Sequence, residues 1–248
     1  MSPNESSVSF IVFALNEEAN IAATVETLRQ AVSNAPIADY QIVLVDDGST
    51  DSTGTIMDSL ASTDGKISVV HNQTNLGPGG AFKRGGAAAR CDYLMPIAGD
   101  NAAPAKSIRA TIERLGEADI IISYVANPEI RSVRRRVGAY AFKTIINLLF
   151  GYKMPYYNGA VPRRELFNKI DINSEGYAFF AEMVVKLMRL GSSYVTIGVE
   201  HTIDANASSS ALKPKNLMKV FRDLVHLFRD VRRSDALPLR ERRPLPRR

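Results

Sequence analysis

Cysteine and histidine are scarce in this sequence of 248 residues. Cys91 is the single cysteine, which excludes a disulfide bond within the chain. Three scattered histidines, His71, His201 and His226, with no second thiol argue against a zinc site built from cysteine and histidine. We therefore expect the chemistry of this protein to rest on carboxylates, arginines and lysines.

Long hydrophobic runs are also missing. No apolar stretch reaches the roughly 18 residues that a membrane-spanning helix needs. The first seven residues, MSPNESS, are polar and lead directly into a predicted strand, so we expect no secretory signal. These features predict a cytoplasmic protein.

Charge is unevenly distributed along the chain. The net charge is +5, and residues 229–248 carry 8 arginines against 3 acids, so the rest of the chain is neutral. A basic tail suits an anionic membrane surface or nucleic acid, and a solvated, disordered end is the structural alternative. The neutral body carries no recognised nucleic-acid-binding motif, so we expect no such partner. We divide the chain into one domain, residues 1–232, and a basic tail rich in proline and arginine, residues 233–248.

Short apolar runs alternate with helical patterns in the first hundred residues. The runs are residues 8–13, 41–45, 67–70 and 93–97. Such runs are typical of strands buried on both faces, and their alternation with helices predicts a parallel sheet. We expect an α/β fold with a single, Rossmann-like, mostly parallel sheet flanked by helices, and Asn16 should cap the first helix.

Acidic side chains follow three of these runs. Glu17 follows the first run, Asp46 and Asp47 end the second, and Asp100 follows the fourth. The carboxyl ends of parallel strands meet at one edge, where ligands bind in open α/β sheets, so these acids should gather there. Clustered carboxylates repel unless a cation or ligand donors offset them, which favours a divalent metal, Mg²⁺ or Mn²⁺, holding a diphosphate. A plain polar turn is the alternative for Asp46 and Asp47.

A glycine-rich turn at residues 75–81 should open a further helix. Its glycines, Gly77 and Gly79 among them, would let the backbone approach a ligand or a neighbouring element closely. The turn does not have the GxxxxGK[ST] pattern of a phosphate-binding loop. A flexible loop whose glycines serve packing alone is the other interpretation.

The order of four motifs resembles the family 2 glycosyltransferases, which have the GT-A fold. The motifs are ALNEE from residue 14, VLVDDGSTDST from residue 43, NLGPGGAFKRGGAAA from residue 75 and GDNAAP from residue 99. The similarity covers roughly residues 8–230. It is strongest to the branch that contains dolichol-phosphate mannose synthase and bacterial polyprenyl-phosphate glycosyltransferases.

The resemblance implies an inverting enzyme with a nucleotide-diphosphate sugar as its donor. Asp100 would hold the metal and the diphosphate, and would thereby be catalytic. The residues implied in binding the donor are Phe13, Ala14, Leu15, Asn16, Glu17, Asp46, Asp47, Gly77, Gly79 and Lys213.

Two positions depart from the family pattern. Phe13 stands where proline is common, and Ala98 stands where the first acid of an Asp-x-Asp motif is usual. With Asp100 as the remaining carboxylate, most metal affinity should come from the diphosphate of the donor. The same departure supports an alternative function, a nucleotide-sugar-binding subunit with impaired catalysis.

Four arginines follow a strand predicted at residues 119–123. They are Arg131, Arg134, Arg135 and Arg136. They form either a solvated face or a phosphate site, because a guanidinium offers fixed bidentate donors. The resemblance favours an acceptor phosphate, and we assign catalytic roles to Arg131 and Arg134. A phosphate monoester is already an anion at neutral pH and needs no base, so we predict a polyprenyl phosphate acceptor of the dolichyl or undecaprenyl type.

Two apolar segments bear on membrane attachment. Residues 139–150 are apolar on nearly all sides, which places them either in the core or at a membrane interface. Residues 215–231 form an amphipathic helix, either a core helix or a basic helix lying on a surface. The loop at residues 201–214, with Lys213, is a lid or a plain connection. We predict peripheral attachment to the cytoplasmic face of an anionic membrane, with a membrane-embedded subunit as a further candidate partner.

Glu182 is the one late candidate for a general base. It lies in a helix predicted at residues 175–190, among apolar side chains. Such a carboxylate is either a base with a raised pKa or a helix-surface or ion-paired residue, and we favour the second interpretation. Its role as a base belongs to the alternative in which a hydroxyl group, as in polysaccharide synthesis, accepts the sugar.

Overall fold

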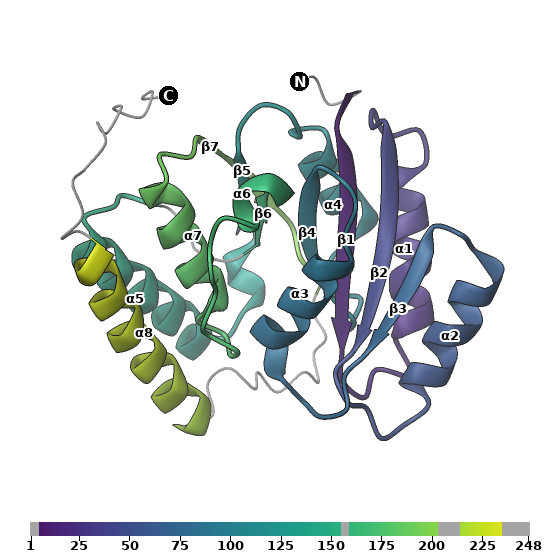
Figure 1. Cartoon of the computed structure of the whole chain (residues 1–248), viewed down its shortest axis with the longest axis horizontal. Helices are drawn as coiled ribbons and strands as arrows, with labels where there is room; N and C mark the ends of the chain where they lie inside the picture. The colour runs from purple at the N-terminus through teal and green to yellow at the C-terminus, as the bar shows by residue number, and fades with distance from the viewer. Residues whose placement is uncertain (1–4, 155–158, 203–213, 235–248) are drawn as a thin grey trace.

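The computed structural model describes residues 5–154, 159–202 and 214–234 (Figure 1). The strands are β1 (Ser7–Ala14), β2 (Asp39–Asp46), β3 (Ile67–His71), β4 (Tyr93–Ala98), β5 (Ile120–Val125), β6 (Ala160–Pro162) and β7 (Tyr194–Val199). The helices are α1 (Ile21–Val32), α2 (Thr53–Thr63), α3 (Gly77–Ala88), α4 (Ala105–Ile112), α5 (Val133–Phe150), α6 (Arg164–Phe167), α7 (Phe179–Arg189) and α8 (Pro214–Ser234), with a short 3₁₀ helix at Pro128–Ile130.

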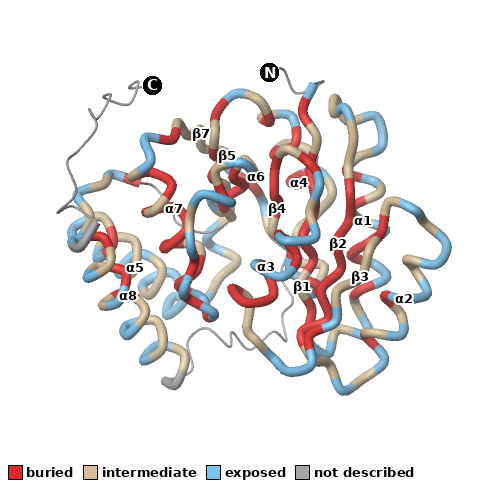
Figure 2. Tube along the Cα trace, viewed as in Figure 1, coloured by how far each residue is buried: buried red, intermediate tan, exposed pale blue. Residues whose placement is uncertain are grey.

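The first four strands form a parallel sheet in the order β3-β2-β1-β4. Successive side chains of a strand point to opposite faces, so the alternating apolar residues feed two cores. Ile11 and Val43 pack towards α3 and α7, whereas Phe10 and Ile42 pack towards α1, α2 and α4. Figure 2 shows β1, β2 and β4 as largely buried. The predicted α/β fold with a mostly parallel sheet is confirmed.

The strands form two hydrogen-bonded sheets where the sequence predicted a single one. The second sheet has the order β6-β5-β7, in which β5 pairs antiparallel with β6 and parallel with β7. An isolated antiparallel bridge between Tyr93 and Arg163 joins β4 to the start of α6. The Tyr93 hydroxyl also donates a hydrogen bond of 2.7 Å to the carbonyl of Ala118, just before β5. The two sheets therefore stand next to one another through Tyr93.

The start of the first helix differs from the prediction. Helix α1 begins at Ile21, so Asn16 is not its cap. Asn16 instead has a φ angle of +56°, a conformation that asparagine tolerates better than most residues. Its side-chain oxygen accepts a hydrogen bond of 2.8 Å from the amide of Thr50, which holds the loop against the end of β2.

Helices α5 and α8 lie side by side at one end of the molecule (Figure 1). Their contact includes the rings of Phe150 and Phe228, 6.2 Å apart. Ile146 is buried in the core and Phe142 and Phe150 pack against it, whereas Tyr140 and Leu148 are exposed, so the core interpretation of residues 139–150 holds for one face of α5. Helix α8 buries Leu224 and leaves Phe221 exposed, so the core interpretation holds for one face of the helix, and its attachment to a surface stays a prediction. In the described ranges, no helix is long and apolar enough to cross a membrane.

Candidate functional site

The strand ends predicted to carry the site lie side by side in the sheet. Strand β1 lies between β2 and β4, with Ala14 paired to Asp46 and Phe13 paired to Ala98. Ala14 is buried, Phe13 is half-buried and Leu15 is exposed. The register therefore brings the ends of all three strands to one edge, as the sequence predicted.

Asp46 is held by the protein at this edge. Its carboxylate accepts a hydrogen bond of 2.9 Å from the amide of Ser49 and lies 3.2 Å from Nδ1 of His71. Burial by itself would raise the pKa of Asp46, but these hydrogen bonds outweigh burial and lower it. Nε2 of His71 lies 3.0 Å from Asp58, whose hydrogen bond is the largest cause of a raised pKa for His71.

His71→Gln should make stability less dependent on pH. The folded state raises the pKa of His71. Its two ion pairs therefore stabilise the fold fully at pH values below the ordinary histidine pKa of about 6.5. They lose this effect as the pH rises through the raised pKa. Thermal unfolding of wild type and variant should therefore differ most at acidic pH and converge at alkaline pH. Asp58→Asn, which removes the stronger partner, should reproduce most of the difference. A constant difference across pH would contradict this assignment.

The loop after β1 is hydrogen-bonded to the loop after β2. The amide of Asn16 donates to the Ser49 hydroxyl at 3.0 Å, and the amide of Glu17 donates to the Thr53 hydroxyl at 2.8 Å. The Glu17 carboxylate accepts from the side chain of Asn20 at 2.9 Å. These contacts bring the first two groups of predicted donor-binding residues together, and their contacts with a nucleotide remain predictions.

Asp47 organises the glycine-rich turn. It is buried, and its two oxygens accept hydrogen bonds from the side chain of Asn72 and the amides of Leu76 and Gly77, at 2.8 to 2.9 Å. Gly77 has a φ angle of +78°, which favours glycine. Asp47 therefore shapes the start of α3 with both of its oxygens.

Gly77 and Gly79 allow the backbone of the turn to lie close to the backbone of Ser174 and Glu175. A Cβ atom on Gly77 would lie 2.7 Å from the carbonyl oxygen of Glu175, and a Cβ atom on Gly79 would overlap the carbonyl oxygen of Ser174. The amide of Gly79 donates to the carbonyl of Glu175 at 2.8 Å. Of the alternatives for this turn, contact with a neighbouring element is the one that the structure shows directly.

Asp100 stands exposed at the end of β4. Gly99 packs against Ala14, since an added Cβ would lie 2.7 Å from the Cβ of Ala14, and its amide donates to the carbonyl of Phe13 at 3.0 Å. The Asp100 carboxylate accepts from the amide of Ala102 at 3.1 Å. This close packing fixes the chain that carries Asp100 directly against the end of β1.

His201 is a neighbour of Asp100 that the sequence analysis did not select. Its pKa is lowered by burial first and by the charge of Arg131 next, while the charge of Asp100 acts in the opposite direction and that of Arg135 in the same one. The amide of Thr202, the next residue, donates to the carbonyl of Ala102 at 3.1 Å. The Thr202–Ala102 hydrogen bond therefore ties the end of β7 to the loop of Asp100, and the charges of Asp100, Arg131 and Arg135 all act on His201.

The arginines at the start of α5 differ in their surroundings. The charges of Arg131 and Arg135 both lower the pKa of His201, although Arg135 is exposed like Arg134 on the same turn. Arg131 lies before α5, which begins at Val133, so no helix-face spacing links it to Arg135 in the sequence. The first turn of α5 contains no acid, so its arginines add to the positive end of the helix dipole. This arrangement favours an anion.

Glu182 is buried and ion-paired. It is 2% exposed, and its carboxylate lies 2.6 Å from Nζ of Lys186. The helix-surface interpretation is therefore wrong, and the ion pair is confirmed. Burial alone would raise the pKa of Glu182, but hydrogen bonds from Asn173, Lys186 and Ser174 outweigh it and lower the pKa. The raised pKa expected of a general base is contradicted.

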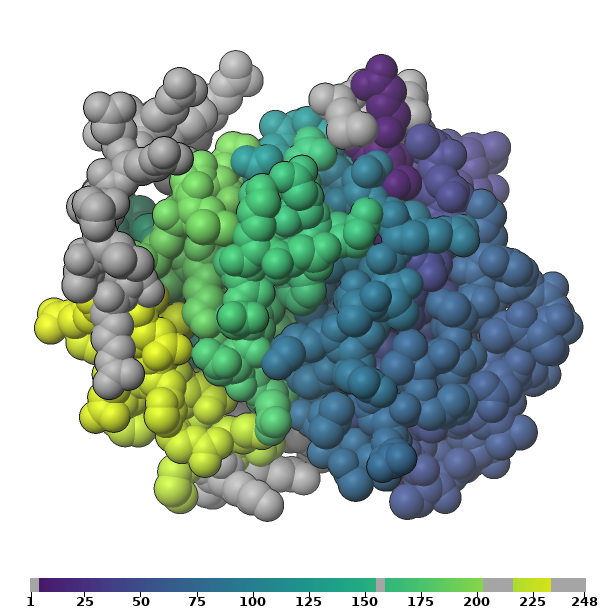
Figure 3. Space-filling view, in the orientation of Figure 1, coloured from purple at the N-terminus to yellow at the C-terminus, as the bar shows by residue number. Residues whose placement is uncertain are grey.

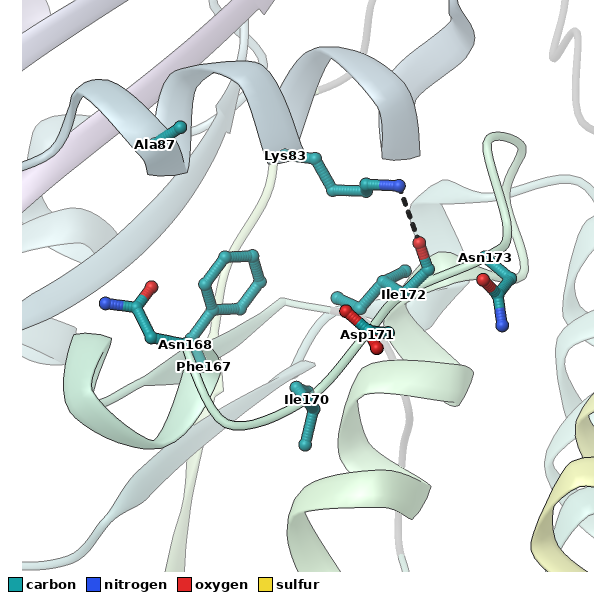
Figure 4. A pocket seen from close by; sticks show the side chains of 8 residues that line it. All are labelled: Lys83, Ala87, Phe167, Asn168, Ile170, Asp171, Ile172 and Asn173. Atoms are coloured by element: carbon teal, nitrogen blue, oxygen red, sulfur yellow. Dashed lines mark hydrogen bonds between the residues drawn. The ribbon is translucent and has the colours of Figure 1, made fainter.

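Two hollows lie away from the strand ends. The first, of about 370 Å³, is lined by Lys83 of α3 and by the segment after α6, and Lys83 donates to the carbonyl of Ile172 at 2.7 Å (Figure 4). The second, of about 320 Å³, lies between α7 and α8 and includes Glu182 and Asp223. Neither hollow contains the acids of the strand ends.

Lys213 and the tail from residue 235 lie outside the described residues, so the predicted lid and the domain boundary remain predictions.

Comparison with known proteins identifies a family. The model of the family described as "Glycosyl transferase family 2" matches residues 9–186. Undecaprenyl-phosphate mannosyltransferase of Micrococcus luteus is 27% identical over 201 residues, which cover 76% of this chain and 81% of the relative. Glycosyltransferase AglD of Haloferax volcanii is 29% identical over 197 residues, which cover 74% of this chain and 31% of that longer protein.

Solved structures show the same fold. Glucosyl-3-phosphoglycerate synthase from Mycobacterium tuberculosis, in complex with Mg²⁺ and uridine diphosphate, matches with a TM-score of 0.67 and 18% identity. The match covers 90% of this chain and 79% of that one. The fold is therefore that of the GT-A glycosyltransferases.

Proposed function

The chain belongs to glycosyl transferase family 2 and is a glycosyltransferase, and from this premise we propose that it moves a sugar from a nucleotide-diphosphate donor to a polyprenyl phosphate. An oxygen of the acceptor phosphate attacks the anomeric carbon of the sugar. The bond from that carbon to the diphosphate breaks, and the nucleoside diphosphate leaves with the electron pair. Attack opposite the leaving group inverts the anomeric carbon.

The donor side of the proposal rests on the edge formed by β1, β2 and β4. The loops that carry Asn16, Glu17 and Asp46 are fixed to one another there, and Asp100 projects from the same edge. This supports binding of the nucleotide along the strand ends and of the diphosphate near Asp100. The solved relative that holds uridine diphosphate and Mg²⁺ in the same fold is consistent with this assignment.

A divalent metal fits this edge only as a site shared with the donor. Asp100 is exposed and Ala98 supplies no ligand, and the described residues contain no group of three side chains able to hold a metal ion by themselves. Mg²⁺ usually takes one or two carboxylates together with substrate phosphates, which matches such a site. When bound, the metal would neutralise the charge on the leaving diphosphate. Asp100 would hold and orient it there.

The observation that carries the acceptor is that the charges of Arg131 and Arg135 act on His201, whose amide bonds to Asn127 and whose neighbour Thr202 bonds to the loop of Asp100. Two guanidiniums at the start of α5 would offer fixed donors to a phosphate next to the departing diphosphate. The acceptor would enter as an anion, so the chain needs no base. The rival assignment, a hydroxyl acceptor with Glu182 as base, disagrees with the burial and lowered pKa of that residue.

Incubation with radiolabelled nucleotide sugars and membranes tests this function. We expect a labelled product that partitions into organic solvent and releases its sugar in mild acid, because a glycosyl phosphate is acid-labile. A water-soluble product would refute the lipid phosphate and favour a hydroxyl acceptor. Donor binding without any transfer would instead favour the impaired nucleotide-sugar-binding subunit.

We also propose that α5 and α8 attach the protein to the cytoplasmic face of an anionic membrane, where its lipid acceptor would reside. Large apolar side chains are well exposed on both helices: Val137, Tyr140 and Leu148 on α5, and Met218 and Phe221 on α8. Basic residues accompany them on both helices, and each contributes about 1 kcal/mol near an anionic surface. A membrane-embedded partner subunit could share this surface.

Flotation with vesicles should show attachment that depends on salt. Wild-type protein should float with anionic vesicles at low salt and be released at high salt, because screening weakens the attraction. Leu148→Ser together with Met218→Ser should reduce flotation by about tenfold, since each removes exposed apolar area. Leu190→Ser, at an exposed leucine just after α7, is the matched control. Equal binding to neutral and anionic vesicles would contradict the electrostatic contribution.

A further inference from the structure

The glycine-rich turn is held from two opposite sides. On the sheet side, Asp47 accepts the amide of Gly77 at 2.9 Å. On the other side, the turn rests on residues 173–175, here called the strap. The amide of Gly79 donates to the carbonyl of Glu175, and neither glycine leaves room for a Cβ atom against the strap. The position of the turn therefore depends on the strap as much as on the sheet.

The strap is itself held by Glu182. One carboxylate oxygen of Glu182 accepts the amide of Asn173 at 2.9 Å, and the other accepts the amide of Ser174 at 2.7 Å. Lys186 completes the arrangement with a hydrogen bond of 2.6 Å to the first oxygen. Figure 3 shows the green segment that contains the strap lying against α3. Two consecutive strap amides thus find their acceptors on one buried side chain.

We propose that Glu182 is a positioning residue for the nucleotide-sugar site, which acts through the strap on the glycine-rich turn. The inference rests on the proposed function, because the turn matters to the donor only if a nucleotide sugar binds at the strand ends. Glu182 itself is 2% exposed and its two oxygens are occupied by amide and ammonium donors, so it does not reach the reacting atoms. Its contribution is to keep Gly77 and Gly79 where Asp47 can hold them.

The substitution Glu182→Gln makes the inference testable. A carboxamide accepts hydrogen bonds only at its oxygen, so its NH₂ group would face either a strap amide or Lys186, which are both donors. One strap amide would lose its acceptor, and the strap would loosen from α7. Because the strap supports the turn and not the acceptor arginines, donor affinity should fall more than the rate at saturating donor.

The experiment compares Glu182→Gln with Glu165→Gln. Glu165 forms an exposed pair with Lys169, 2.7 Å apart and four residues along a helical turn, so it matches the chemical change without touching the strap. Calorimetry with uridine and guanosine diphosphates in the presence of Mn²⁺ measures donor-side affinity. Hydrogen exchange of single amides in the nucleotide-free protein measures the strap directly.

We expect Glu182→Gln to weaken nucleoside diphosphate binding by about tenfold and to change kcat at saturating donor by less than about threefold. The amides of Asn173, Ser174 and Gly79 should exchange faster, while those of β2 remain protected. Unchanged affinity, or a uniform increase in exchange across all elements, would overturn the inference and leave Glu182 as a purely structural residue. Loss of turnover at unchanged affinity would overturn it in favour of a base. Failure of the wild type to bind any nucleoside diphosphate would instead refute the proposed function and, with it, the role of Glu182.

Discussion

Asp100→Asn should lower kcat/KM for sugar transfer by about 100-fold or more. Removing one group that stabilises transition-state charge commonly costs a factor of about 100 to 1,000. The carboxamide of this variant keeps an oxygen that can accept the Ala102 amide, so the local fold should survive while the negative charge is lost. Steady-state kinetics over a range of Mn²⁺ concentrations, together with circular dichroism to check folding, measures the effect.

Calorimetry of the same variant distinguishes metal binding to the free protein from metal binding in the presence of nucleoside diphosphate. In the wild type, Mn²⁺ should bind weakly to the free protein and tightly in the presence of nucleoside diphosphate, because Asp100 is a single protein carboxylate and the diphosphate supplies further ligands. Asp100→Asn should weaken the second event. Glu165→Gln is a control at an exposed carboxylate outside the strand ends. Tight Mn²⁺ binding to the free wild-type protein, or full activity of Asp100→Asn, would contradict the proposed metal site.

Arg131→Ala and Arg135→Ala should each raise the KM for the lipid phosphate by about 10 to 100-fold. A hydrogen bond to a charged group contributes about 1.5 to 3 kcal/mol, which corresponds to that range. Donor affinity should change little, because the proposed nucleotide site lies on the side of β1 and β2. The measurement is initial rate against acceptor concentration, with nucleoside diphosphate binding measured in parallel.

Arg134→Ala tests whether Arg134, selected from the sequence, or Arg135, selected from the structure, binds the acceptor together with Arg131. The sequence analysis assigned Arg131 and Arg134 to catalysis, whereas Arg135 shares the surroundings of His201 with Arg131. We expect Arg134→Ala to raise the acceptor KM less than Arg135→Ala does. If all three variants bind acceptor like the wild type, these arginines are a solvated face, and the acceptor site lies elsewhere.

The sheet and the strand-end acids could be predicted because they depend on local patterns. Short apolar runs at β1, β2 and β4 marked their strands, and the parallel order then brought their ends to one edge without further information. The start of α1 could not be placed this way. Asn16 has the composition of a cap, but the hydroxyl of Ser49 and the amide of Thr50, which belong to another loop, decide its conformation.

The rest of the site depends on contacts between distant segments. His201 gave no local signal, and only the folded chain places it near Asp100. For Glu182 the sequence favoured a helix-surface or ion-paired residue, and its burial could not be predicted because the amides that its carboxylate accepts belong to the strap, which precedes the helix. The sequence predicted that Gly77 lets the backbone approach either a ligand or a neighbouring element. The structure shows that the neighbouring element is the segment with Glu175, which is far from Gly77 in the sequence.

The bridge at Tyr93 also bears on the order in which this chain folds. Strands β1 to β4 follow one another closely along the chain, so their sheet can form without any residue beyond Ala98. Strand β5 finds its first partner, β6, only at Ala160, and its parallel partner, β7, only at Tyr194. Non-local pairing of this kind is slow because a long loop must close first. The sheet of β1 to β4 should therefore be the early folding unit, on whose β4 edge the β6-β5-β7 sheet assembles last.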